Sequence, residues 1–340
     1  MSSSQGQSIN KGIMSTKSTF KKFSSMREFS VLVFLIGICI VMTIVSPAFA
    51  SQDTLVNVLY NISTQGILAI GMTAALISGG FDLSVGAVLG LTCTVTAQLY
   101  LSSGLNVWIA AIVGMLIAIG IGAANGFFIT KLGLSSFITT LAMMGIARGA
   151  VYVVSKGVTL SMTSASPVFL EIGKGKVGII PNIGIILIIM AIVFDILMRR
   201  SRMFRKVYYS GSSETAARMS GINSNRVKFF VYVFLGGLAG LCGILSVMRF
   251  SMAAPTLGTG TELTVISACV IGGCSLNGGQ GTVLGAILGV ILLAVVSSSM
   301  TLLSVSIFWQ QLVTSLILLI AVTMDSINER MKANKLMLDS

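Results

Sequence analysis

Side chains that could carry out chemistry are scarce in this chain. Its 340 residues include 10 acidic and 22 basic residues, five cysteines and no histidine. Without histidine, the chain cannot assemble a histidine-based catalytic triad, a histidine-ligated metal or a histidine proton relay. The cysteines stand in apolar stretches without C-x-x-C spacing, so we interpret them as small hydrophobic residues. We therefore expect neither an enzyme active site nor a metal site.

The first polar motif reads SGGFDLSVG over residues 78–86. Its two glycines permit a sharp turn, and Asp82 or Ser84 can cap the helix that follows. Two interpretations remain open. The residues alone favour a plain helix–turn–helix corner; the functional alternative is a hinge or path-lining turn that contains Gly79, Gly80, Asp82 and Ser84.

The second motif reads GSSETAARMSGI over residues 211–222. Ser213 stands three residues before Ala216, and Glu214 opens the next turn, which is typical of a helix start. Gly221 suits the end of that helix. We expect a short capped helix that presents the small residues Ala216 and Ala217 as a docking surface. The alternative is a solvated basic loop.

The third motif runs from Ala254 to Leu263 and continues into a glycine-rich stretch at residues 271–281. We expect Glu262 to lie at an outer membrane boundary. The chain contains no G-x-x-x-x-G-K-[ST] sequence, so we expect no nucleotide site here. Arg148 is the one ionisable residue plainly inside an apolar run. The lack of a series of buried carboxylates argues against a proton-coupled pump.

The elements that must position these motifs are membrane-spanning helices. The composition is 54% apolar and only 9% charged, whereas a soluble domain carries about 25% charged residues. A membrane helix needs about 20 mostly apolar residues. The eighth of ten apolar runs is short and could be a half-helix or re-entrant segment. The runs lie near residues 29–45, 58–78, 85–101, 108–129, 137–154, 183–198, 229–247, 263–273, 283–303 and 309–324.

The basic residues orient these spans. With a cytoplasmic N-terminus, Lys156, Lys174, Lys176 and Arg249 lie outside, Arg148 lies within a span, and all other basic residues lie inside, as positive-inside topology requires. The net charge of +12 therefore needs no nucleic-acid partner. We predict cytoplasmic tails at 1–28 and 326–340, a transmembrane domain at 29–325 and a cytoplasmic loop at 199–228.

A weak internal repeat links two of these motifs. Gly79-Gly80-x-x-Leu83 resembles Gly272-Gly273-x-x-Leu276, and each pair stands between two apolar runs. Membrane transporters often carry internal repeats with the substrate path between them, so Gly272 and Gly273 join the candidate path or hinge. Chance similarity in a glycine-rich chain is the alternative.

Together the motifs resemble the permease subunits of bacterial ABC importers for monosaccharides, of the ribose/xylose/autoinducer type. The resemblance covers about residues 30–325. One departure is Thr264, where that family often has Asp. The matching segments are the GGFDLSVG motif at 79–86, the stretch from Asn125-Gly126 to Arg148-Gly149, the EAA-like loop at 214–222, residues 254–281 and Phe308-Trp309-Gln310-Gln311.

The resemblance implies an all-α bundle of about ten transmembrane helices, similar to the type II cobalamin importers, in the bacterial inner membrane. It implies a second permease copy, an ATPase subunit that binds ATP–Mg, and an extracytoplasmic sugar-binding protein; the chain itself would hold no cofactor. It places ATPase coupling at Glu214, Ala216, Ala217, Arg218 and Gly221, and the translocation path or hinge at Gly79, Gly80, Asp82, Ser84, Asn125, Arg148, Glu262, Gly272 and Gly273.

Two other functions remain open. A stand-alone secondary carrier or channel for a small polar solute would need an ion-coupling site inside the bundle, and the few acidic residues argue against it. An intramembrane enzyme would need a nucleophile–base pair, which the residues do not readily supply. The motifs identify neither the sugar nor whether two identical permeases pair.

Overall fold

The computed structural model describes residues 27–338, so the predicted N-terminal tail lies almost wholly outside the described residues. The described chain is an all-α bundle with two small two-stranded sheets. Among the described residues, seven helices are long and apolar enough to cross a membrane, and three shorter apolar stretches, Val31–Val45, Thr261–Ile271 and Ile307–Thr323, accompany them. The ten helices that contain these segments overlap the ten predicted spans: α2 (Arg27–Val45), α3 (Gln52–Ile77), α4 (Val85–Ser103), α5 (Val107–Lys131), α6 (Ser136–Ser155), α8 (Asn182–Arg200), α11 (Ser224–Phe250), α12 (Thr261–Ile271), α13 (Val283–Leu302) and α14 (Ile307–Leu338).

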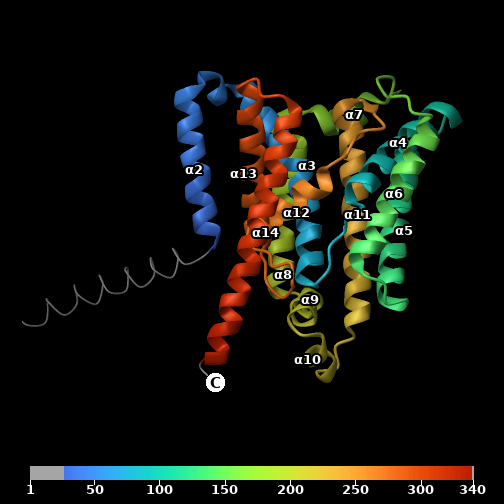
Figure 1. Ribbon diagram of the computed structural model, residues 1–340. Coiled ribbons are helices and arrows are strands. Elements are labelled where there is room, and N and C mark those ends of the chain that lie inside the picture. The colour runs from blue at the N-terminus through green and yellow to red at the C-terminus, as the bar shows by residue number, and fades with distance from the viewer. Residues whose placement is uncertain (1–26, 339–340) are drawn as a thin grey trace, which may run out of the picture.

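The short elements mark the two ends of the bundle (Figure 1). One end carries α9 (Arg202–Ser212), α10 (Glu214–Met219) and the end of α14; we call it the α10 end. The opposite end carries η1 (Pro47–Ala50) and α7 (Pro167–Lys174). Both the first described turn of α2 and the last of α14 lie toward the α10 end.

Burial separates inner helices from outer ones. In α4 the apolar window is 72% buried, whereas in α6 and α8 it is 22% buried. A helix that is apolar all round and yet exposed in the isolated chain must face lipid or another subunit. The outer helices α6 and α8 therefore supply the surface of the bundle, and α3, α4 and α11 supply its interior.

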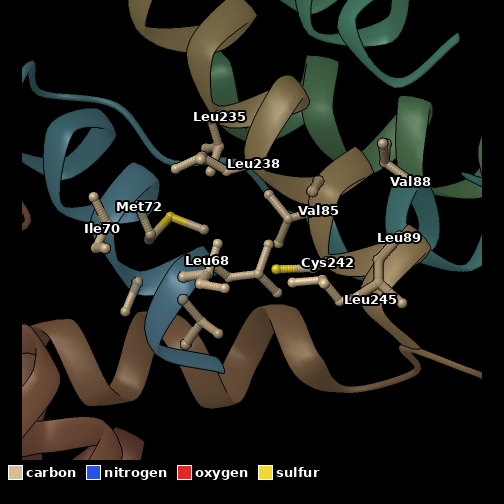
Figure 2. Close-up of a cluster of buried hydrophobic side chains, with 14 of the residues drawn as sticks. Leu68, Ile70, Met72, Val85, Val88, Leu89, Leu235, Leu238, Cys242 and Leu245 are labelled. Atoms are coloured by element: carbon tan, nitrogen blue, oxygen red, sulfur yellow. The ribbon is translucent and has the colours of Figure 1, made fainter. Parts of the chain in front are cut away.

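The core lies where α3, α4 and α11 meet (Figure 2). Leu68, Met72, Val85 and Leu235 are buried there beside Cys242. Beside this core, α5 packs on α11 through small residues. A Cβ added to Gly236 would lie 2.9 Å from the Cα of Gly122, so these two helix backbones approach as closely as small residues allow.

The two glycine motifs of the suggested repeat end α3 and α12 with the same geometry. The amide of Gly80 donates to Ala75 O at 3.0 Å, and that of Cys274 donates to Cys269 O at 2.9 Å. The residue before each donor is a left-handed glycine, Gly79 (φ +80°) or Gly273 (φ +96°), as in a Schellman cap. Gly79 thus corresponds to Gly273, one residue beyond the pairing that the sequence suggested. Both helices are followed by an apolar helix, α4 or α13.

A broken segment leads from α11 into α12. Strand β4 (Met252–Ala253) pairs with β1 (Leu160–Ser161), and turns follow up to residue 260. Helix α12 has 11 residues, or about 16 Å at 1.5 Å per residue, half of a bilayer core about 30 Å thick. The half-helix interpretation of the eighth apolar run agrees with this length. The other sheet, β2 (Lys176–Val177) with β3 (Ile180–Pro181), leads into α8.

Candidate functional site

A buried polar cluster holds the turn between α3 and α4. Asp82 is 2% exposed, and its Oδ1 accepts from the amide of Ser84 at 2.7 Å and from its hydroxyl at 2.6 Å. The side-chain amide of Asn125, on α5, donates to Asp82 Oδ2 at 3.2 Å and to Ser84 Oγ at 3.0 Å. Three predicted path residues are therefore brought together, with no ion pair to Asp82 among the described residues.

This geometry differs from the expected helix cap. Ser84 is the N-cap residue of α4, but its side chain makes no capping bond to the helix. Asp82 instead accepts from the amide of Ser84 itself, and Ser84 Oγ is engaged by Asp82 and Asn125. The bonds to α5 explain the difference, because they hold Ser84 Oγ in the cluster instead of at the first turn of α4.

Two further helices hold the same turn. Thr140 on α6 accepts from the amide of Leu83 at 3.1 Å. The Tyr232 hydroxyl on α11 donates to Phe81 O at 3.3 Å, and a Cβ on Gly80 would lie 2.5 Å from that hydroxyl. The turn thus has specific contacts with α5, α6 and α11, so a shift of any of these helices is transmitted to it.

Arg148 joins α6 to the broken segment before α12. Its Nη1 donates to Pro255 O at 3.0 Å and to Leu257 O at 2.9 Å. Both acceptors are backbone carbonyls outside any helix or strand, so neither accepts a hydrogen bond of regular secondary structure. Arg148, the intramembrane charge identified in the sequence, therefore holds the shape of residues 254–258.

Glu262 is buried in the bundle and does not lie at the outer boundary where the sequence placed it. Its Oε1 accepts from the amide of Gly260 at 3.2 Å, and its Oε2 has no hydrogen-bond partner among the described residues. A Cβ on Gly86, in the first turn of α4, would collide with this Oε2 and with Gly258 O. The turns at 254–260 run along α4 and carry Glu262 inward, which the hydropathy pattern does not reveal.

Helix α10 begins and ends as predicted. Ser213 Oγ accepts from the amide of Ala216 at 3.2 Å, which confirms the N-cap. Gly221 has φ +74°, its amide donates to Arg218 O, and the amide of Ile222 donates to Ala217 O. This is a left-handed glycine ending. Nothing lies within 4 Å of a Cβ added to Gly221, so its backbone angle alone calls for glycine.

Glu214 forms its ion pairs within this chain. Its two carboxylate oxygens pair with Arg218 at 2.8 Å and with Lys228, on α11, at 3.0 Å. The hydrogen bond from Lys228, followed by the nearby charges of both cations, lowers the pKa of Glu214 below its ordinary value. The pairs fix α10 against the start of α11, so two predicted coupling residues, Glu214 and Arg218, also contact each other within this chain.

The docking face of α10 also differs from the expected one. Ala217 is only 3% exposed and packs within this chain, so it cannot face a partner. Thr215, Ala216 and Met219 are exposed, with Met219 at 86%. Arg218 and Ser220 are exposed as well, so the outward face of the helix combines small, polar and basic side chains with Met219.

A glycine contact missed in the sequence links this region to the core. A Cβ on Gly211, in the last turn of α9, would collide with Ile77 O at the end of α3. The amide of Gly279 donates to the same oxygen at 2.8 Å, and the added Cβ of Gly278 would lie 2.8 Å from Gly211 O. The last turn of α9 thus rests directly on the end of α3 and on the loop that follows α12. The glycines at 211, 278 and 279 were the signal available in the sequence.

A cavity of about 470 Å³ opens beside this contact. It lies between the α3–α4 turn, the end of α5 with the loop to α6, α10 and the first turns of α11. Gly79 and Gly80 are part of its lining, and so are Glu214, Arg218 and Lys228. Two of the predicted coupling residues and two of the predicted hinge glycines therefore share one cavity. Gly272 lies elsewhere, in close backbone contact with Gly285 of α13.

Comparison with known proteins identifies full-length relatives. The family described as "Branched-chain amino acid transport system / permease component" matches residues 54–322. The ribose import permease protein RbsC of Escherichia coli is 36% identical over 309 residues, 90% of this chain and 96% of that protein. RbsC of Bacillus subtilis is 34% identical over 300 residues, 88% and 93% of the two chains. The L-arabinose transport system permease protein AraH of Escherichia coli is 33% identical over 317 residues, 93% and 95%. No solved structure matches the chain significantly.

These matches confirm the resemblance drawn from the motifs. The matched range contains the polar cluster at Asp82, the Arg148 contact, α10 and both glycine turns. The described helices are of the number and apolar character that a multi-pass membrane protein requires. With 79% of its length matched by one family and relatives aligned almost end to end, this chain belongs to the permease components of that transport family.

Proposed function

We propose that this chain is the membrane-spanning subunit of an ATP-driven ABC importer for a monosaccharide. The names of the relatives, which refer to ribose and L-arabinose, support a pentose or similar sugar. The subunit lies in the bacterial inner membrane with both termini cytoplasmic, and the α10 end faces the cytoplasm. The concentration of basic residues at that end supports this orientation.

Coupling between ATP hydrolysis and transport runs through α10 and α9. The outward residues of α10 seat in a groove of a separate ATPase subunit, and Gly211 transmits the movement to Ile77 at the end of α3. The observation that carries this proposal is the direct backbone contact of α9 with the end of α3 and with the loop that follows α12. A helix that only connected two spans would need no such contact.

The energy source lies in a partner. This chain lacks a P-loop sequence, so ATP–Mg belongs to the ATPase subunit, and an extracytoplasmic binding protein delivers the sugar to the end that carries α7. Transport then requires no cofactor in this chain. The path passes the Asp82–Ser84–Asn125 cluster and the segment held by Arg148, with Glu262 beside it.

A second permease copy completes the path. Helix α6 exposes Gly145 and Gly149, and nothing lies within 4 Å of a Cβ added to either glycine. Small residues one turn apart allow close approach of two membrane helices. Arg148 lies between these two glycines in the sequence, so pairing through α6 would place the broken segment of each copy beside the dimer interface.

Reconstitution tests the function. The chain is placed in proteoliposomes with and without its ATPase and binding protein, and uptake of labelled ribose, arabinose, xylose and glucose is measured. We expect uptake of one sugar class that requires both partners and ATP. We also expect the permease part of the complex to have a molar mass equal to two copies of this chain. Uptake that persists without ATPase or ATP would establish a stand-alone carrier or channel instead.

A further inference from the structure

A second cavity, of about 510 Å³, adjoins the cavity beside α10 and shares Thr130, Lys131 and Asn225 with it. It is formed between the last turns of α5 and the first turns of α11. Its walls include the rings of Phe127 and Phe229, which are 48% and 38% exposed. Phe229 also packs on Gly126, whose added Cβ would lie 2.9 Å from its ring. The cavity is thus an apolar groove that is open on the outer surface of the bundle.

Two cations stand at the rim of this groove. Lys131 ends α5 and Arg226 lies in the first turn of α11, and both side chains are exposed. Neither forms an ion pair with another described residue. Asn225 and Thr130 complete the polar part of the lining. The groove therefore has apolar walls and an uncompensated positive rim.

The groove lies at the depth of lipid headgroups. Helix α5 has 25 residues, more than the roughly 20 that cross the hydrocarbon core, so its last turn reaches the interface. Leu132 and Leu134, which follow Lys131, are 58% and 47% exposed and line the cavity beside α10. Lys131 lines both cavities, so the groove meets the cavity beside α10 at the end of α5.

We propose that this groove binds an anionic phospholipid. The acyl chain lies against Phe127 and Phe229, and the phosphate lies between Lys131 and Arg226. Basic pockets between helices on the cytoplasmic side of a membrane take such headgroups. Arg226 is two residues from Lys228, which forms an ion pair with Glu214 of α10. The bound lipid would therefore stabilise the start of α11, where α10 is held.

Native mass spectrometry of the full chain in detergent tests this proposal. Phosphatidylglycerol and phosphatidylcholine with identical acyl chains are titrated separately. We expect phosphatidylglycerol to bind at least fivefold more tightly. Each basic side chain near a headgroup is worth roughly fivefold in binding. The double variant K131Q/R226Q should therefore lose about tenfold or more of phosphatidylglycerol affinity and little of phosphatidylcholine affinity.

A matched control removes the same charge elsewhere. The double variant R205Q/K206Q changes two exposed cations of α9, outside the groove, and should bind phosphatidylglycerol like the wild type. Equal affinity for the two lipids, or equal losses in both double variants, would overturn the proposal.

Two further outcomes identify a different ligand. Inorganic phosphate that displaces phosphatidylglycerol at equal concentration would show that the rim binds a free anion and that the apolar walls contribute nothing. Loss of ATPase association in K131Q/R226Q, with unchanged phosphatidylglycerol binding, would assign the two cations to the ATPase contact. Either outcome contradicts the lipid assignment and leaves the transport function untouched.

Discussion

Gly211 of α9 lies directly against the carbonyl oxygen of Ile77 at the end of α3, with no space for a side chain between them. The two residues are far apart in sequence and belong to different parts of the molecule, a surface helix and a core helix. Because the same oxygen accepts from the amide of Gly279, α9, the end of α3 and the loop between α12 and α13 meet at a single carbonyl. Movement of α9 must therefore move the end of α3 or break this contact.

The substitution Gly211→Ala tests that contact. The added methyl group overlaps Ile77 O, and forcing extra volume into a packed site costs about 1–3 kcal/mol. We expect a lower melting temperature and ATP hydrolysis that no longer drives uptake at the wild-type ratio. The control is Gly120→Ala on α5, where an added Cβ meets nothing within 4 Å. Wild-type coupling in Gly211→Ala would exclude transmission through α9.

Asp82→Ala should destabilise the chain through its hydrogen-bond cluster. The substitution leaves the buried amide and hydroxyl of Ser84 without their Asp82 acceptor and removes one of the two acceptors of the Asn125 side-chain amide. A buried donor without a partner costs about 1–3 kcal/mol. We expect a lower melting temperature in detergent and reduced uptake, with Asp82→Asn losing less because it keeps one acceptor oxygen.

The control for this measurement is Asp53→Asn, an exposed carboxylate in the first turn of α3. It removes the same charge without opening a buried site and should change the melting temperature little. An Asp82→Ala variant as stable and as active as the wild type would show that the cluster neither holds the turn nor serves transport.

The sequence predicted local features well and buried connections poorly. All ten apolar runs became helices, and the caps at Ser213 and Gly221 formed, because each depends on residues within a few positions of one another. The burial of Ala217 and Glu262 was not predicted. It depends on how α10 packs on the neighbouring helices α9 and α11 and on turns that run beside α4, and these are tertiary contacts. The spacing of apolar residues along a short stretch of sequence carries no information about such contacts.

Helix α10 allows a direct test of which face docks. Ala216→Trp places a large ring on the exposed face and should weaken ATPase association at least tenfold while the permease keeps its melting temperature. Ala217→Trp forces the same ring into a buried position and should lower the melting temperature as well. Copurification with the ATPase and thermal unfolding measure the two effects.

The reverse result would correct the assignment of the two faces. If Ala217→Trp abolished ATPase association without any loss of stability, and Ala216→Trp had no effect, the buried face would have to become exposed before docking. Thr215→Ala is the matched control, since it removes exposed atoms next to Ala216 without adding volume and should leave association within about threefold of wild type.

Arg148→Gln should loosen residues 254–258 without disturbing α10. The substitution removes the donor for two carbonyls, Pro255 O and Leu257 O, each of which costs about 1–3 kcal/mol if it stays buried and unpaired. Hydrogen exchange in residues 252–260 should rise, sugar uptake should fall, and exchange in residues 214–222 should match the wild type. Unchanged exchange in the broken segment would show that Arg148 does not hold it.

Glu262 allows a further test of Arg148, because both side chains lie beside α4. A Cβ on Gly90 would lie 3.2 Å from Arg148 Nη1, and one on Gly86 would collide with Glu262 Oε2. Gly86 and Gly90 are about one helical turn apart, near 6 Å along α4, so the two charges are neighbours without a direct ion pair.

Removing Arg148 leaves the buried carboxylate without its nearby cation, and Glu262→Gln removes that penalty. The double variant Arg148→Gln/Glu262→Gln should therefore unfold at a higher temperature than Arg148→Gln alone, with a coupling energy of about 0.5–3 kcal/mol. Strictly additive effects would mean that the two side chains act on the broken segment independently.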